Sequence, residues 1–334
     1  MTAMANDRSA ATAVRSGLLF AVLSATSFAL SGPLARGLTD EGWNPGAVVL
    51  ARIAIAALVV APLAARTLRG RWGLLWRNRR IVLLYGAVPV AGTQFAYFSA
   101  VATMDVGPAL LIEYTAPAVI VVWLWLRHGE RPRALTVAGA GVAAVGLVLV
   151  LDLLSGADLA LDGVLWALAA MLGAATYFVM SADTRTGVPP LALAGGGLLV
   201  GSVGLAVLGL VGVLPMRATT TAPTYAGEAV PWWLPFLGLG VVTAAIAYTA
   251  GIAASRRLGS RLASFVALLE VVAAVIFAWL LLGQLPSMLQ FVGGAFIVAG
   301  VIVVKLGERP PGVDAADVRR VRPPGSPVAA GQAD

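Results

Sequence analysis

The sequence predicts an all-α integral membrane protein with ten transmembrane helices, arranged as two inverted five-helix repeats, with the N- and C-termini cytoplasmic. Three observations carry this prediction: the composition, a series of apolar runs of membrane-spanning length, and a similarity between the two halves of the chain. Of the 334 residues, 59% are hydrophobic and 12% are charged, and the mean hydropathy is +0.89. A soluble domain carries about 25% charged residues, and a chain of this length cannot hide so much apolar surface from water.

Apolar runs of about 20 residues, the length needed to cross a hydrocarbon core of ~30 Å, recur along the whole chain. Ten spans are predicted, at residues 16–35, 45–64, 81–102, 107–126, 135–153, 162–181, 191–214, 232–254, 262–282 and 288–305. The loops between them are mostly short, so consecutive helices are expected to be antiparallel neighbours. The first run resembles the core of a signal peptide, but we interpret it as a span because the internal repeat requires it.

The distribution of basic residues orients these spans. With the N-terminus inside, 20 of the 23 lysines and arginines fall on the inner side, in both tails and in loops 65–80, 127–134, 182–190 and 255–261. Only Arg36 and Arg217 fall outside, and Arg52 lies within a span. Such asymmetry is typical of cytoplasmic loops. Both termini are therefore expected to be cytoplasmic, which requires an even number of spans.

The two halves of the chain are similar at a shift of 154 residues. Trp125 aligns with Trp279, Gly129 with Gly283, and Gly146 with Gly300. This divides the chain into an N-terminal cytoplasmic tail (1–15), a first five-helix repeat (16–153), a second repeat (162–305) and a C-terminal cytoplasmic tail (306–334), which is expected to be disordered. Five is odd, so the second repeat enters the membrane from the opposite side. Accordingly, the charged inner loop GERPR corresponds to the uncharged outer loop GQLPS. Inverted repeats are typical of secondary transporters, where they surround one central site.

Several residues carry a resemblance to a known family: Arg52 in the second span, Pro117 in the fourth, Gly129 and Glu130 before the fifth, and Gly139 and Gly146 within it. Together with the five-plus-five repeat, they make residues 16–305 resemble the drug/metabolite transporter superfamily, EamA type. The second repeat departs from the family pattern at Val271 and Gln284. The resemblance implies a carrier of small metabolites or drugs, often an exporter of amino acids or related solutes. It also implies a central cavity lined by helices of both halves.

Residue types that are absent or rare exclude most enzyme chemistry. The chain has no cysteine, one histidine (His128) and one lysine (Lys305). Thiolate nucleophiles and His-pair metal motifs are therefore absent, and Lys305 does not lie in a phosphate-binding loop. No cofactor and no metal are expected, and the chain is not expected to be an enzyme. The net charge of +7 is explained by inner loops rather than by nucleic acid. The expected partners are the lipid bilayer and a small-molecule substrate, with the chain a monomer or homodimer.

Three charged residues within spans are the main candidates for the transport pathway. Glu113 and Glu270 are the only acidic residues well inside spans, and both are expected near the bilayer midplane. An ionisable group at that depth is costly and usually functional. The carboxylates are predicted to bind a substrate ammonium or to carry a proton, unless they form a structural ion pair with Arg52. Arg52 itself is interpreted either as that helix-locking partner or as an anchor for a substrate carboxylate.

Five polar-tipped side chains within apolar spans complete the predicted pathway: Gln94, Tyr97, Tyr114, Tyr177 and Tyr248. Buried hydroxyl and amide groups need hydrogen-bond partners, which a substrate cavity supplies in part. For any one of these residues, packing between helices is the alternative. A second pattern, the small residues Gly139, Ala143 and Gly146 on one helical stripe, predicts close helix packing.

These observations predict a secondary active transporter that exports small metabolites across the inner (cytoplasmic) membrane by alternating access. Amino acids or related solutes are the expected substrates, and protons are a candidate coupling ion. Two alternatives stay open: a facilitative carrier that uses the same residues, and a solute channel. A channel usually places rings of like groups around a pore, and no such pattern is found. A membrane-embedded enzyme is disfavoured because the two intramembrane acids lie far apart in the sequence.

Overall fold

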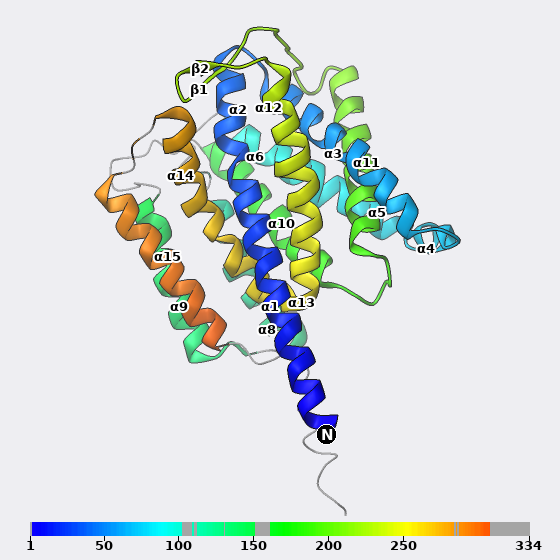
Figure 1. Cartoon of the computed structure of the whole chain (residues 1–334), viewed down its shortest axis with the longest axis vertical. Helices are drawn as coiled ribbons and strands as arrows, with labels where there is room; N and C mark the ends of the chain where they lie inside the picture. Colours follow the sequence, from blue (N-terminus) through cyan, green and yellow to red (C-terminus); the bar gives the residue numbers. More distant parts are fainter. Residues whose placement is uncertain are drawn as a thin grey trace, which may run out of the picture.

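The computed structural model describes residues 2–101, 109, 112–129, 131–150, 161–283, 285 and 287–307. Most of them are helical, and the helices form one bundle (Figure 1). The elements are α1 (Thr2–Ala29), α2 (Ser31–Asp40), α3 (Pro45–Thr67), α4 (Trp72–Arg77), α5 (Arg79–Tyr85), η1 (Gly86–Gly92), α6 (Thr93–Val101), α8 (Ala116–His128), α9 (Ala134–Val150), α10 (Leu161–Ala182), α11 (Pro190–Leu210), β1 (Thr224–Tyr225), β2 (Glu228–Ala229), α12 (Trp233–Leu237), η3 (Gly238–Ile246), α13 (Ala247–Ala267), α14 (Leu269–Leu282) and α15 (Met288–Gly307).

The bundle has the apolar exterior of a membrane protein. Within the described part of the chain, six helical segments are long and apolar enough to cross a membrane: Thr12–Asp40, Pro45–Thr67, Leu161–Ala182, Pro190–Leu210, Trp233–Ala267 and Met288–Gly307. Three shorter apolar helices accompany them, at Ala116–Arg127, Ala134–Leu149 and Leu269–Leu282. Large side chains such as Leu126 and Leu210 lie on the outer surface, 78% and 86% exposed, as lipid-facing residues do. The prediction of a helical membrane protein is confirmed, while the count of ten spans and the side of each terminus stay predictions.

The structure differs from the predicted boundaries in several places. Helix α1 begins at Thr2, within the expected N-terminal tail. The predicted third span consists of α5, the π-helix η1 and α6. A two-stranded hairpin, β1–β2, interrupts the long loop after α11, so the fold is not entirely helical. The C-terminal tail from residue 308, Glu130 and Gln284 lie outside the described residues.

The two halves share the same local backbone features, namely glycine-terminated helices, π-helices and helix interruptions, at a shift of 154 residues. Gly129 ends α8 with φ +69°, and Gly283 ends α14 with φ +68°. Both adopt the left-handed conformation that glycine allows at a helix C-terminus. A π-helix recurs as η1 in the first half and η3 in the second. In the corresponding spans the helix is interrupted just before α8 and at Leu268, between α13 and α14.

Helices α9 and α15 pack in backbone contact at one side of the bundle (Figure 1). A Cβ atom placed on Gly139 would lie 2.8 Å from the Gly300 carbonyl oxygen, and one on Gly146 would lie 2.6 Å from the Gly293 carbonyl oxygen. These four glycines are exchanged in pairs by the 154-residue shift, so the contact is pseudo-symmetric. The predicted close packing at Gly139 and Gly146 is confirmed.

The replacement Gly146→Leu is expected to abolish this packing, because the new side chain would collide with the α15 backbone. The control is Gly141→Leu on the same helix, where no atom lies within 4 Å of an added Cβ. The expected result is a fall of the melting temperature and loss of the monodisperse peak in size-exclusion chromatography for Gly146→Leu alone. Equal stability of the two variants would contradict the packing described here.

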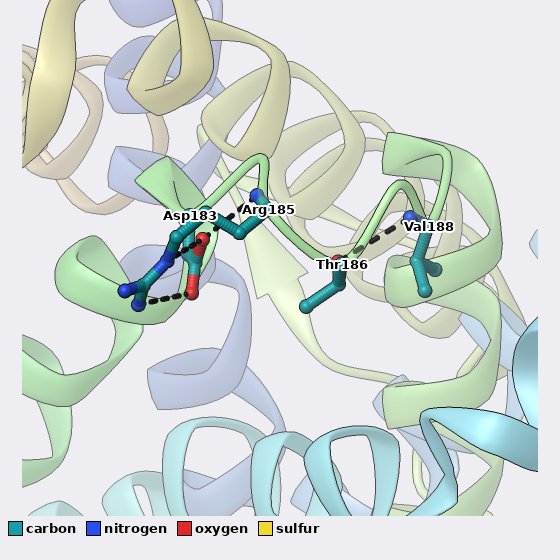
Figure 2. Close-up of polar contacts among 4 residues, drawn as sticks. All are labelled: Asp183, Arg185, Thr186 and Val188. Atoms are coloured by element: carbon teal, nitrogen blue, oxygen red, sulfur yellow. Dashed lines mark hydrogen bonds and ion pairs between the residues drawn. The ribbon is translucent and has the colours of Figure 1, made fainter.

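The turn between α10 and α11 is fixed by its own side chains (Figure 2). Arg185 donates from Nε and Nη2 to the Asp183 carboxylate at 3.0 and 2.8 Å, and its backbone N–H donates to the same group. These hydrogen bonds lower the pKa of Asp183 below its ordinary value. The Asn78 amide donates to the Thr186 carbonyl oxygen at 3.3 Å. Loops 65–80 and 182–190, both predicted on the inner side, are therefore neighbours.

Candidate functional site

A cavity of about 580 Å³ lies inside the bundle and is lined by residues of both halves. The first half contributes residues of α1, α2, α3, η1, α6 and around the start of α8, and the second half contributes residues of α10, η3, α13 and α14. All eight residues predicted for the transport pathway line it: Arg52, Gln94, Tyr97, Glu113, Tyr114, Tyr177, Tyr248 and Glu270. The structure therefore brings together side chains that are up to 218 residues apart in the sequence.

Arg52 projects from α3 and is 4% exposed. Its Nη1 donates to Gln94 Oε1 at 3.1 Å, and its Nη2 donates to the Thr243 carbonyl oxygen of η3 at 2.7 Å. The guanidinium carbon lies 5.7 Å from the centre of the Phe28 ring. The described residues thus give Arg52 neutral acceptors and an aromatic face, rather than an ion pair with Glu113 or Glu270. The predicted helix-locking ion pair is not observed.

The close approach of η3 to α3 depends on a glycine. An added Cβ at Gly240 would lie 2.3 Å from Ile55 Cγ2 and 3.3 Å from the Arg52 carbonyl oxygen. Glycine therefore lets the π-helical segment pack directly on α3, and this brings the Thr243 carbonyl oxygen to Arg52. The orientation of the guanidinium is set by contacts with both halves of the chain.

The two glutamates lie at the helix interruptions that recur in both halves. Glu113 precedes α8, next to the turn at Tyr114 and Thr115, and Glu270 lies in the first turn of α14, just after Leu268. At the shift of 154 residues, Glu113 aligns with Ala267 and Glu270 aligns with Ala116. Each half therefore supplies one carboxyl group near its helix interruption, but the two glutamates do not occupy equivalent positions. A helix N-terminus favours an acidic group such as Glu270.

Two tyrosine side chains, Tyr97 and Tyr114, lie near the two carboxyl groups. The Tyr114 hydroxyl forms a hydrogen bond with the Glu270 carboxyl group. Both Tyr97 and Tyr114 also interact electrostatically with Glu113 and Glu270. Glu113 and Glu270 also interact electrostatically with each other. The two acids therefore form one site rather than two independent ones.

Aromatic rings form part of the cavity wall near Arg52. The ring of Tyr248 lies edge to face with Phe28 at 5.1 Å and with Tyr177 at 5.8 Å between centroids. Tyr177 in turn contacts Phe178 at 5.0 Å. Gly251 leaves room for the Tyr177 hydroxyl beside Ser24. The cavity thus has a cationic part, an acidic part and an aromatic wall.

The sequence did not predict Phe28, Ser24 or Thr243 as neighbours of the site. Phe28 and Ser24 lie in an apolar span where neither stands out, and Thr243 contributes a backbone oxygen, which any residue could supply. The only available signal was the position of Ser24 and Phe28 one helical turn apart on α1, which places them on one face.

The hairpin β1–β2 joins the two helices at one end of the cavity. The Tyr225 hydroxyl donates to the Leu34 carbonyl oxygen of α2 at 2.6 Å, and the Ala226 N–H donates to the Leu281 carbonyl oxygen of α14 at 2.6 Å. Arg36 and Leu282, from the same two helices, line this end of the cavity. Arg36 forms an ion pair with Asp40 at 2.8 Å. The hairpin therefore holds the walls of the cavity mouth together.

An apolar helical bundle that encloses a cavity lined by charged and tyrosine side chains of both halves is typical of a multi-pass membrane transporter. The chain belongs to the EamA-like transporter family, whose pattern matches residues 15–152 and again residues 161–306. The resemblance noted in the sequence is confirmed.

Individual relatives agree with this assignment. An uncharacterized transporter of Archaeoglobus fulgidus is 26% identical over 294 residues, covering 87% of this chain and 96% of the relative. The uncharacterized inner membrane transporter YicL of Salmonella typhimurium is 20% identical over 302 residues, covering 88% of this chain and 97% of its own length. A solved crystal structure shares the fold, with a TM-score of 0.68 and 23% identity over 89% of this chain and 99% of the other.

Proposed function

We propose that the protein is a secondary active transporter that exports small metabolites, amino acids or related solutes, across the inner (cytoplasmic) membrane by alternating access. Protons are the candidate coupling ion. One observation carries the proposal: a buried arginine without an ion-pair partner among the described residues shares one cavity with two carboxyl groups. An unpaired charge at such a depth is costly, and a substrate that neutralises it explains its presence.

The arrangement matches the chemistry of an amino acid. Arg52 offers charge-assisted hydrogen bonds to a carboxylate, while Glu113 and Glu270 offer acceptors for an ammonium group. Phe28, Tyr177 and Tyr248 offer rings against which an apolar side chain can pack. A cavity of about 580 Å³ lies within the range of small-molecule sites. The same groups would serve a facilitative carrier, and measured coupling distinguishes the two.

Counterflow in proteoliposomes tests the proposal. Purified protein is reconstituted into vesicles loaded with an unlabelled amino acid mixture, and uptake of labelled amino acids is followed together with a pH-sensitive dye in the lumen. The proposal predicts transient accumulation of label that saturates with concentration. Counterflow accompanied by net efflux that moves no proton for any transported amino acid would indicate a facilitator. Flux that neither saturates nor shows counterflow would indicate a channel and contradict the proposed carrier.

A further inference from the structure

We propose that the cavity exchanges one monocationic substrate for one proton, so that amino acids with a basic side chain are its coupled substrates. Zwitterionic amino acids are then transported with no net movement of protons. The inference rests on the proposed transport function and adds which substrates are coupled and with what stoichiometry. It comes from the number of charges on the cavity wall and from what neutralises each of them.

Four charged side chains line the cavity within the described part of the chain: Arg36, Arg52, Glu113 and Glu270. Arg36 lies at the mouth and is neutralised by Asp40 at 2.8 Å. The deep part of the cavity therefore holds one guanidinium and two carboxyl groups. Its charge is −1 when all three groups are ionised.

The groups around these three charges are themselves neutral. Arg52 donates to the Gln94 amide oxygen at 3.1 Å and to the Thr243 carbonyl oxygen at 2.7 Å. The other titratable side chains facing the carboxyl groups are phenols, which are uncharged at neutral pH. They come from α6, the turn before α8, α10 and α13, as Tyr97, Tyr114, Tyr177 and Tyr248. Since no further charged side chain of the described residues lines the cavity, we assign the balance of the remaining negative charge to a bound proton or a bound substrate.

Charge balance then determines whether a proton stays bound in the cavity when a given amino acid binds. Net charge enclosed near the centre of a bilayer is costly, so the cavity is expected to be nearly neutral whenever it is closed on both sides. The empty cavity reaches neutrality with one proton on the pair of carboxyl groups. A zwitterionic amino acid adds no net charge, so this proton stays bound. A basic amino acid adds one positive charge, so the proton leaves, and the empty cavity carries a proton back in the opposite direction.

Lysine and norleucine test this inference, because norleucine is lysine without the side-chain ammonium group. Vesicles containing the full-length protein are loaded with one labelled amino acid, and its net efflux is measured together with luminal pH, with the membrane potential clamped at zero or at about −100 mV. We expect one proton to enter per lysine that leaves and none per norleucine, with less than a twofold effect of potential on either rate. Lysine efflux that carries net charge, or norleucine efflux that moves protons, would overturn the inference.

The same assay separates this inference from the proposed function. Efflux of norleucine without efflux of lysine would support the proposed transport function but overturn the exchange of a monocation for a proton. Efflux of neither would contradict both proposals.

The variant Glu270→Gln gives a second readout. It leaves one positive and one negative group in the deep cavity, so no proton is available to compensate the extra charge of lysine. The ratio of lysine to norleucine efflux is expected to fall at least tenfold, and the proton entry per lysine is expected to disappear. A purely structural role would lower both rates by the same factor and leave the ratio unchanged. Glu228→Gln, an exposed position in β2, is the matched control and should keep the original ratio.

Discussion

The replacement Arg52→Gln is expected to lower amino acid counterflow at least tenfold at subsaturating substrate. Hydrogen bonds to a charged partner contribute about 1.5–3 kcal/mol, and about 1.4 kcal/mol corresponds to a factor of ten in affinity. Arg52 is 4% exposed, and its two described hydrogen bonds go to neutral oxygens. No described carboxyl group forms an ion pair with Arg52, so a substrate carboxylate would be its direct anionic partner. The half-saturating substrate concentration in proteoliposomes measures the effect.

Two further variants separate substrate binding from support of the helices. Arg52→Lys keeps the positive charge and should restore part of the affinity, although it loses the forked geometry of the guanidinium. Arg217→Gln removes an exposed arginine outside the cavity and should transport like the original protein. If Arg52→Gln lowers the melting temperature but leaves the half-saturating concentration unchanged, Arg52 joins α3 to η3 and α6 and does not bind substrate.

The replacements Glu113→Gln and Glu270→Gln are each expected to lower lysine counterflow at least tenfold while the protein still inserts and stays monodisperse. Each removes one of the two carboxyl groups, which are both ionised when lysine is bound, and a glutamine side chain is a neutral and weaker acceptor. Glutamine keeps nearly the same volume, so packing at the helix breaks should be preserved.

Size-exclusion chromatography and counterflow, measured on the same preparations, distinguish binding from folding here. Glu228→Gln in the β1–β2 hairpin is the control, since it makes the same chemical change at an exposed site. Rates equal to the original protein for both cavity variants, across all transported amino acids, would make the two carboxyl groups structural.

The features of the fold that the sequence predicted are those with a strong local signal. Long apolar runs required helices, and the glycines at 139 and 146 predicted the close contact of α9 with α15. The boundaries that differed have no such signal. The helix breaks at Leu268 although neighbouring leucines favour continuation. The hairpin is formed by two residues on each side of a turn, too short for an alternating pattern.

The candidate site was predictable as a set of residues but not as an arrangement. Glu113, Glu270 and Arg52 were conspicuous because charged residues are rare within spans. Which of them pair depends on the rotation of each helix, and the sequence left the ion pair with Arg52 open. The structure gives Arg52 the backbone oxygen of Thr243 instead. No sequence pattern predicts that contact, because it results from the close approach that Gly240 permits.

The central claim is that the cavity shared by the two halves binds the transported substrate. Because the natural sequence has no cysteine, single cysteines can be labelled without altering the rest of the chain. Ala274→Cys places a thiol on α14 in the cavity wall, and Thr221→Cys places one in the exposed loop before β1. The account predicts that a transported amino acid slows maleimide labelling of Ala274→Cys, with half-protection near the concentration that half-saturates counterflow, and leaves Thr221→Cys unaffected. Unchanged labelling of Ala274→Cys in a variant that still shows counterflow would contradict it.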